Sequence, residues 1–114
     1  MLFSDVKVWL LKPTVVRAAK RGNLDKVKQL LDQGVDVNTR DGYGRTALME
    51  ASREGHAALV SLLLARGADP ELESFSNTNA FQYAKNSSVH NLLTQHLTKT
   101  ASQPLQNSKK NGDR

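Results

Sequence analysis

The sequence predicts an all-α fold in which pairs of helices stack into a repeat solenoid. Residues 55–69 have a counterpart 33 positions earlier, at 22–36, in which Gly, Val, Leu, Leu, Gly and Asp recur at one offset. A second step of 33 carries Ala51 to Ala84. A repeat of this length with two helical patterns per unit is typical of stacked helical arrays. Such arrays usually present a binding surface and no reaction centre, so the period bears on function as well as on fold.

The best-preserved unit contains start and stop signals for two helices. Thr46 is a good N-cap, because its hydroxyl can accept a bond from a free backbone N–H in the first turn. Gly55 and Gly67 are expected to end the two helices, since glycine tolerates the left-handed backbone found there. The second helix should bury one apolar stripe, made of Leu59, Val60, Leu63 and Leu64.

The connection before this unit carries a turn signal. Asp41 and Gly42 form a dipeptide that favours tight turns in which a residue needs positive φ. We therefore expect this dipeptide at the tip of a short hairpin-like finger.

The repeat pattern divides the chain into three parts. We expect a repeat domain at 13–97, in units of about 13–41, 42–74 and 75–97. The first segment, 1–12, is apolar and is expected to cap the first unit, with a partner-binding strip or a membrane-surface anchor as alternatives. In the last segment, 98–114, Leu105 is the only large apolar side chain, so a disordered basic tail is expected.

The positive charge does not follow the repeats. The formal net charge is +5, but nine Lys or Arg and nine acidic residues balance between Pro13 and Glu73. The excess comes from the first segment, Lys85 and the tail. A nucleic-acid groove should carry its charge on the folded face, so the pattern argues against nucleic acid as the partner. Binding of nucleic acid or an anionic surface through the basic tail remains the alternative function.

The absence of a membrane span and of a secretory signal favours an intracellular location, whereas the absence of cysteine does not by itself fix the compartment. The chain has no cysteine, which excludes disulfides and the usual cysteine-containing zinc sites. It has no stretch near the roughly 20 apolar residues of a membrane span. The N-terminus lacks the basic start and cleavage site of a secretory signal. We expect a cytoplasmic and/or nuclear protein without a membrane partner.

The second unit contains a set of residues at characteristic spacing: Asp41, Gly44, Thr46-Ala47-Leu48-Met49, Ala51, Gly55-His56, Val60, Leu63-Leu64 and Gly67-Ala68-Asp69. In these residues the unit resembles the ankyrin repeat. The first unit keeps part of this pattern, and the third is worn, with Ser88 where glycine is usual. The resemblance covers about Pro13 to Leu97 and implies an ankyrin-type solenoid. It also implies a non-catalytic adaptor or regulatory module that binds a protein through its finger loops and the concave face of its first helices.

The family's exposed, variable positions give the candidate partner-binding residues. They are Lys20, Arg21, Tyr43, Arg45, Arg53, Glu54, Phe75 and Thr78. Arginine and aromatic side chains on a rigid face are common binding hot spots. We expect an acidic or mixed-charge protein segment as partner, and neither a small-molecule substrate nor a cofactor.

Asn38 is a hypothetical modification site. Leu30 followed by Asp36-Val37-Asn38 resembles the context in which ankyrin repeats are modified by an asparaginyl hydroxylase. The alternative is that Asn38 bonds the backbone of its finger. No catalytic or metal site is expected: His56 occupies the family's structural Gly-His position, and His90 and His96 are not spaced for one helix face.

Overall fold

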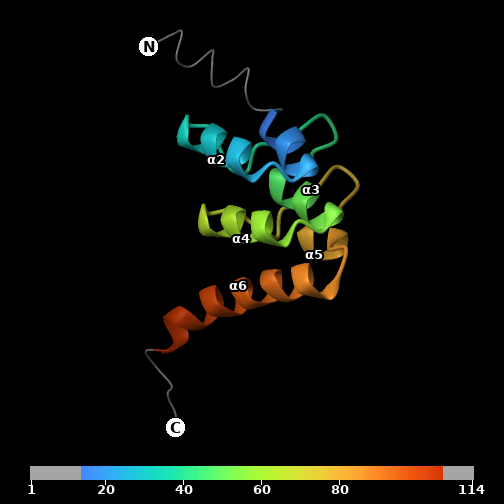
Figure 1. Cartoon of the computed structure of the whole chain (residues 1–114). Helices are drawn as coiled ribbons and strands as arrows, with labels where there is room; N and C mark the ends of the chain where they lie inside the picture. Colours follow the sequence, from blue (N-terminus) through green and yellow to red (C-terminus); the bar gives the residue numbers. More distant parts are fainter. Residues whose placement is uncertain (1–13, 107–114) are drawn as a thin grey trace.

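The helices of the chain stack in two columns (Figure 1). The computed structural model describes residues 14–106, and the side chains of residues 14–97. One column contains the helical segment 14–21, α3 (Ala47–Glu54) and α5 (Ala80–Tyr83). The other contains α2 (Leu24–Asp32), α4 (Ala57–Ala65) and α6 (Ser87–Gln106). No strand occurs between residues 14 and 106, so the predicted all-α repeat fold is confirmed.

Local signals begin and end the helices of the middle unit as predicted. The Thr46 hydroxyl accepts a bond from the Met49 N–H at 3.3 Å, and the Met49 sulfur accepts the Thr46 N–H at 3.4 Å. Gly55 follows α3 with a φ of 82°, the left-handed backbone in which glycine is favoured. Methionine therefore takes part in the N-terminal cap of α3 through its sulfur.

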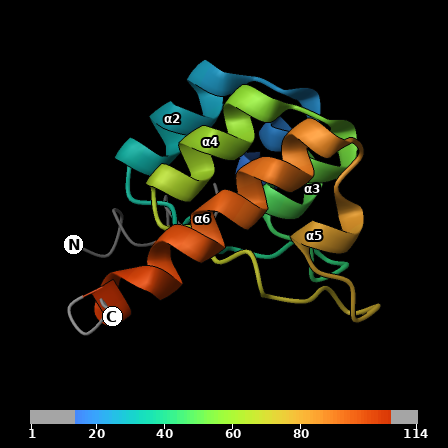
Figure 2. The same cartoon turned by 90° about the horizontal axis from the view of Figure 1, so that it is seen from below.

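The apolar stripe of α4 forms the centre of the core. Leu59, Val60 and Leu63 are at most 1% exposed, and Leu64 is 7% exposed. α4 contacts α2, α3 and α6, and Figure 2 shows it between α2 and α6. The helix therefore joins the first unit to the third, and the predicted core register is confirmed.

Two hairpin-like fingers project beside the column of first helices (Figure 1). In the first finger, the Asp41 N–H donates to the Arg45 carbonyl at 2.9 Å. In the second, the equivalent bond joins the Ser74 N–H to the Thr78 carbonyl at 3.0 Å. The Phe75 N–H donates to the Tyr43 carbonyl at 3.1 Å, so the fingers are bonded to each other.

The glycine that needs positive φ in the first finger is Gly44, and the expectation that placed this requirement on Asp41-Gly42 is wrong. The Gly44 N–H bonds the Asp41 carbonyl at 3.0 Å, which closes a four-residue turn. Gly42 lies inside this turn without positive φ, and Gly44 at its end has a φ of 77°. Its counterpart in the second finger, Asn77, has a φ of 60°, in agreement with the tolerance of asparagine for this region.

The third unit departs most from the expected pattern. α5 has four residues and ends where Ala84 leaves the helical region, at φ −52° and ψ 119°. α6 continues past Leu97 to Gln106, so the expected disordered tail is wrong for 98–106. Thr98 to Gln103 contain neither glycine nor proline, so no strong breaker stops the helix before its last turn, in which Pro104 lies.

The other expectations for the two ends of the chain concern residues that the structure does not describe. The expected cap at 1–12 and the last residues of the tail, 107–114, lie outside the described residues. Within residues 14–106, no helix combines the length and the apolar character needed to cross a membrane.

Candidate functional site

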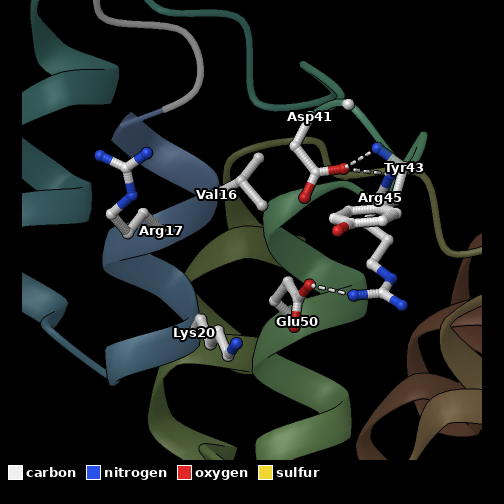
Figure 3. A pocket seen from close by; sticks show the side chains of 8 residues that line it. Val16, Arg17, Lys20, Asp41, Tyr43, Arg45 and Glu50 are labelled. Atoms are coloured by element: carbon white, nitrogen blue, oxygen red, sulfur yellow. Dashed lines mark hydrogen bonds and ion pairs between the residues drawn. The ribbon is translucent and has the colours of Figure 1, made fainter.

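Two cavities adjoin the first finger. The first cavity has a volume of about 340 Å³ and lies between helix 14–21, the finger and α3 (Figure 3). Its lining residues are Val16, Arg17, Lys20, Asp41, Gly42, Tyr43, Arg45 and Glu50. The second cavity, of about 290 Å³, is lined by Gly42, Tyr43, Arg45, Phe75 and Ser76. Because Tyr43 and Arg45 line both, the two cavities are adjacent, and we call them together the concave site.

Two aromatic rings stand exposed at the second cavity. Tyr43 is 68% exposed and Phe75 is 70% exposed. The Arg45 guanidinium carbon lies 4.9 Å from the centre of the Tyr43 ring, within the range of a cation–π contact. The Phe75 ring lies against Gly44, where an added Cβ would be 2.6 Å from the ring. The finger backbone thus places both rings at the site, each with one face covered and most of its surface exposed.

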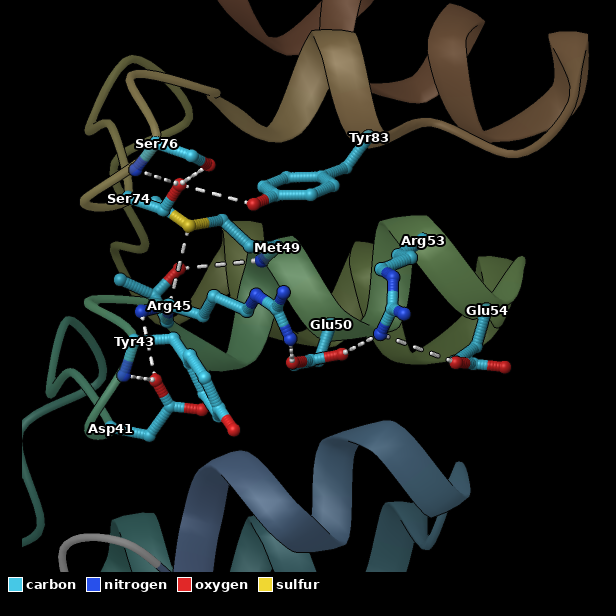
Figure 4. Close-up of polar contacts among 11 residues, drawn as sticks. Asp41, Tyr43, Arg45, Met49, Glu50, Arg53, Glu54, Ser74, Ser76 and Tyr83 are labelled. Carbon is cyan, nitrogen blue, oxygen red and sulfur yellow. Dashed lines mark hydrogen bonds and ion pairs between the residues drawn. The ribbon is translucent and has the colours of Figure 1, made fainter.

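A buried carboxylate on α3, that of Glu50, contacts an arginine of the first finger and an arginine of α3 (Figure 4). Glu50 is 2% exposed. Its two oxygens contact the Arg45 guanidinium at 3.3 Å and the Arg53 guanidinium at 3.1 Å. Arg53 also lies 3.8 Å from Glu54. The positive charges of Arg45 and Arg53 are therefore largely balanced inside the molecule.

Tyr83 extends this polar group toward the third unit. Its hydroxyl lies 3.0 Å from the Ser74 hydroxyl. Burial alone would raise the pKa of Tyr83, but contacts with Ser74, Ser76 and Arg45 favour the phenolate and lower the pKa below its usual value. For Arg45, burial opposes the charged form, but Tyr83 and Glu50 outweigh it and raise the pKa. Arg45 stays charged at any physiological pH.

The structure brings half of the predicted site residues to the concave site. Lys20, Tyr43 and Arg45 line the first cavity, and Phe75 lines the second together with Tyr43 and Arg45. Arg53 and Glu54 belong to the charged row on α3.

Two predicted site residues lie elsewhere. Arg21 is exposed and lines neither cavity. Thr78 closes the second finger, since its hydroxyl donates to the Ser76 carbonyl at 3.2 Å. Both are therefore outside the concave site as the structure forms it.

Three residues of this surface are not among the predicted partner-binding residues, and one signal could have found them. Arg17, Glu50 and Tyr83 are spaced 33 apart, so they occupy the same position in successive units. Arg17 and Glu50 line the first cavity, and Tyr83 lies beneath Arg45, whose guanidinium carbon is 6.0 Å from its ring centre. An alignment of the units column by column would have placed all three on the face that carries Lys20 and Arg53.

Asn38 forms a bond between units. Its side-chain oxygen accepts the Asp69 N–H at 2.9 Å, 31 residues away, and its own N–H donates to Asp36 at 2.9 Å. The expected bond to the backbone of its own finger is therefore replaced by a bond to the next connection. Hydroxylation of Asn38 stays a prediction.

His56 is structural, as predicted: its Nε2 lies 3.0 Å from the Lys20 carbonyl. It thereby connects α4 to the end of helix 14–21. Among the described residues, no cluster of three or more His, Asp or Glu side chains could hold a metal ion.

Comparison with known proteins identifies the repeat. The family described as ankyrin repeats (3 copies) matches residues 15–107. A mitochondrial disaggregase of Bos taurus is 40% identical over 79 residues, which are 68% of this chain and 11% of that protein. A putative ankyrin repeat protein, R664, of Acanthamoeba polyphaga mimivirus is 36% identical over 70% of this chain and 49% of its own length.

A solved structure shows the same fold. The ankyrin repeat domain of Bcl-3, a member of the IkappaB protein family, superposes with a TM-score of 0.67 at 31% identity. The match covers 70% of this chain and 35% of that one. The chain thus spans half or less of the length of these relatives.

Ankyrin repeats are generally protein–protein interaction modules, and their fold is typically non-catalytic. The family match covers most of the sequence, and the structure shows paired helices with intervening fingers at the expected period. The chain belongs to the ankyrin repeat family.

Proposed function

We propose that this chain is a non-catalytic adaptor or regulatory module, which binds a segment of another protein across its fingers and its concave site. The proposal includes the intracellular location, cytoplasmic and/or nuclear, that the sequence favours. One observation carries it: the two large apolar side chains with the greatest exposure among the described residues, Tyr43 and Phe75, stand side by side at one cavity.

The exposure of these rings is informative because the other large apolar side chains are largely covered. Leu24 and Leu97, the other exposed ones, are 39% and 37% exposed, against 68% and 70% for the rings. Adjacent exposed aromatic side chains with an arginine beside them are the composition found at interface hot spots.

The backbone beneath the rings is already ordered. The bond from the Phe75 N–H to the Tyr43 carbonyl, at 3.1 Å, fixes one finger against the other. A partner that packs on both rings therefore loses less conformational freedom than one that must order two separate loops.

Photocrosslinking in cells tests this proposal. A photoreactive phenylalanine derivative at position 43 or 75 should crosslink the chain to a protein partner. The same group at Ser61, an exposed position on α4 in the other column, provides the matched control. Crosslinks of equal yield and pattern at positions 43 and 61 would contradict the proposal.

Affinity measurements with the captured partner complete the test. Tyr43→Ala and Arg53→Ala should each weaken the complex by at least about 1 kcal/mol. For Tyr43 the thermal stability should change little, because the side chain is 68% exposed. Unchanged affinity in both variants would place the interface elsewhere.

A further inference from the structure

We infer that the concave site has a fixed polarity: a carboxylate of the partner binds at Lys20 and Arg17, over the first unit, while an apolar or aromatic side chain binds between Tyr43 and Phe75. The inference rests on the proposed function and specifies the chemistry of the bound segment. It starts from a comparison of the cations near the site that form ion pairs with those that do not.

The cations of the middle unit are paired. Arg45 and Arg53 contact the buried Glu50 at 3.3 and 3.1 Å. By contrast, Arg17 and Lys20 form no ion pair within the part of the chain whose side chains are described, and both are exposed. The available positive charge at the site therefore belongs to helix 14–21, and the sequence-based emphasis on Arg45 and Arg53 shifts to Arg17 and Lys20.

The two cations without an ion pair among the described side chains border the same cavity. Arg17 and Lys20 lie three residues apart, on neighbouring turns of one helix face, and both line the first cavity. In Figure 3, Lys20 leads from helix 14–21 toward α3, whereas the Arg17 side chain leaves the same helix on the side away from α3, so Arg17 must change rotamer to reach a group bound beside Lys20. An acidic side chain entering between helix 14–21 and α3 comes within reach of the ammonium group, and the long Arg17 side chain can fold over it.

The charge of the cavity suits one carboxylate better than a phosphate. Its lining holds three cations (Arg17, Lys20 and Arg45) and two acids (Asp41 and Glu50), a difference of +1. Asp41 Oδ1 already accepts the Tyr43 and Arg45 N–H groups at 2.8 and 3.0 Å, and Glu50 accepts from two arginines. The two carboxylates of the cavity would repel the extra charge of a phosphate more than that of a single carboxylate.

The orientation of the bound segment follows from residues that occupy equivalent positions, 33 apart, in successive units. Position 20 is followed at intervals of 33 by Arg53 and Asn86, so the column runs from a free cation to a paired cation to a neutral amide. Position 17 is followed by Glu50 and Tyr83, again without free positive charge. Along these two columns the attraction for an acid therefore decreases from the first unit to the third, whereas the exposed rings lie toward the third.

Selection from a random peptide library displayed on phage tests the inference with the full chain as bait. Selected peptides should be enriched in Asp or Glu together with an aromatic or large aliphatic residue. Arg17→Gln combined with Lys20→Gln should weaken these peptides at least about tenfold, the loss expected from one charged hydrogen bond. Lys26→Gln combined with Lys28→Gln removes the same charge from exposed positions on α2 and should change affinity less than about twofold.

A second measurement separates a local contact from general attraction. Replacing the acidic residue of a selected peptide by its amide should weaken binding to the wild-type chain, but not further weaken binding to the Arg17→Gln, Lys20→Gln chain. Circular dichroism of each variant shows that the fold is kept, which is expected because both side chains are exposed.

The outcomes distinguish this inference from the proposed function. Peptides that need Tyr43 but tolerate loss of Arg17 and Lys20 would overturn the inference and leave the proposed function standing. A phosphoserine peptide that binds more tightly than its glutamate counterpart would overturn the carboxylate assignment. Peptides indifferent to Tyr43→Ala, or no selected peptide at all, would count against both.

Discussion

Replacing Glu50 by glutamine should destabilise the fold while strengthening the attraction for acids. Glu50→Gln keeps the shape of the side chain but removes the charge shared by Arg45 and Arg53. Hydrogen bonds to charged groups contribute about 1.5–3 kcal/mol each when both partners are shielded from water. The arginine side chains are 26% and 41% exposed, so water replaces part of the lost interaction. We expect a total loss of about 1–3 kcal/mol.

That loss is large for a domain of this size. At about 0.05–0.15 kcal/mol per residue, the described part of the chain has a stability on the order of 5–14 kcal/mol. The melting temperature should fall by about 5–20 °C. The affinity for an acidic ligand should increase, because Arg45 lines both cavities and its charge becomes available when the Glu50 carboxylate is removed. An acidic peptide should bind about 3–10-fold more tightly.

Urea unfolding followed by far-ultraviolet circular dichroism measures the stability, and peptide titration at two salt concentrations measures the binding. Glu54→Gln is the matched control on the same helix, since its carboxylate is 3.8 Å from Arg53 and 36% exposed. The control should lose less than about 0.5 kcal/mol. Equal losses in the two variants would show that Glu50 does not organise the arginines, and unchanged peptide affinity would show that Arg45 is not accessible to ligands.

Three further changes test the core, the fingers and the modification site. Leu63→Ala should lower the free energy of unfolding in urea by about 2–5 kcal/mol, because Leu63 is 0% exposed. Leu62→Ala, at a partly buried position, should lower it clearly less. A loss under about 1 kcal/mol for Leu63→Ala would refute the assignment of the buried face of α4. Gly44→Ala should lower the free energy of unfolding by about 1–3 kcal/mol and displace the Phe75 ring. Gly42→Ala should be nearly neutral, because nothing lies within 4 Å of a Cβ at that position. Equal effects of the two substitutions would contradict the finger geometry. Mass spectrometry of the protein from cells should find one added oxygen at Asn38, and its absence would count against hydroxylation.

Much of the helix stack could be predicted because its signals are local and repeated. Thr46 and Gly55 define α3 through bonds and backbone angles within a few residues of themselves. The α4 stripe appears in the sequence as the spacing of Leu59, Val60 and Leu63. A 33-residue period then places such elements side by side without knowledge of any long-range contact.

The candidate site was harder to predict because it depends on which charges meet in space. Arg53 and Glu50 are three residues apart on a helix, so their pair could have been expected. Arg45 precedes the helix and reaches the same carboxylate from the finger, which spacing alone does not reveal. The length of α6 was missed for a different reason: low apolar content argues against a buried helix, but it does not prevent a helix from continuing past its packed part.

The bond between the fingers has a consequence for how specificity in this repeat could change. Because the Phe75 N–H is held by the Tyr43 carbonyl at 3.1 Å, a residue inserted into or deleted from either loop would displace one ring relative to the other. The apolar core around α4 would be little affected, since none of its buried residues lies in either finger. Small changes in loop length could therefore redirect the module to a ligand with a different spacing of side chains, at little cost in folding.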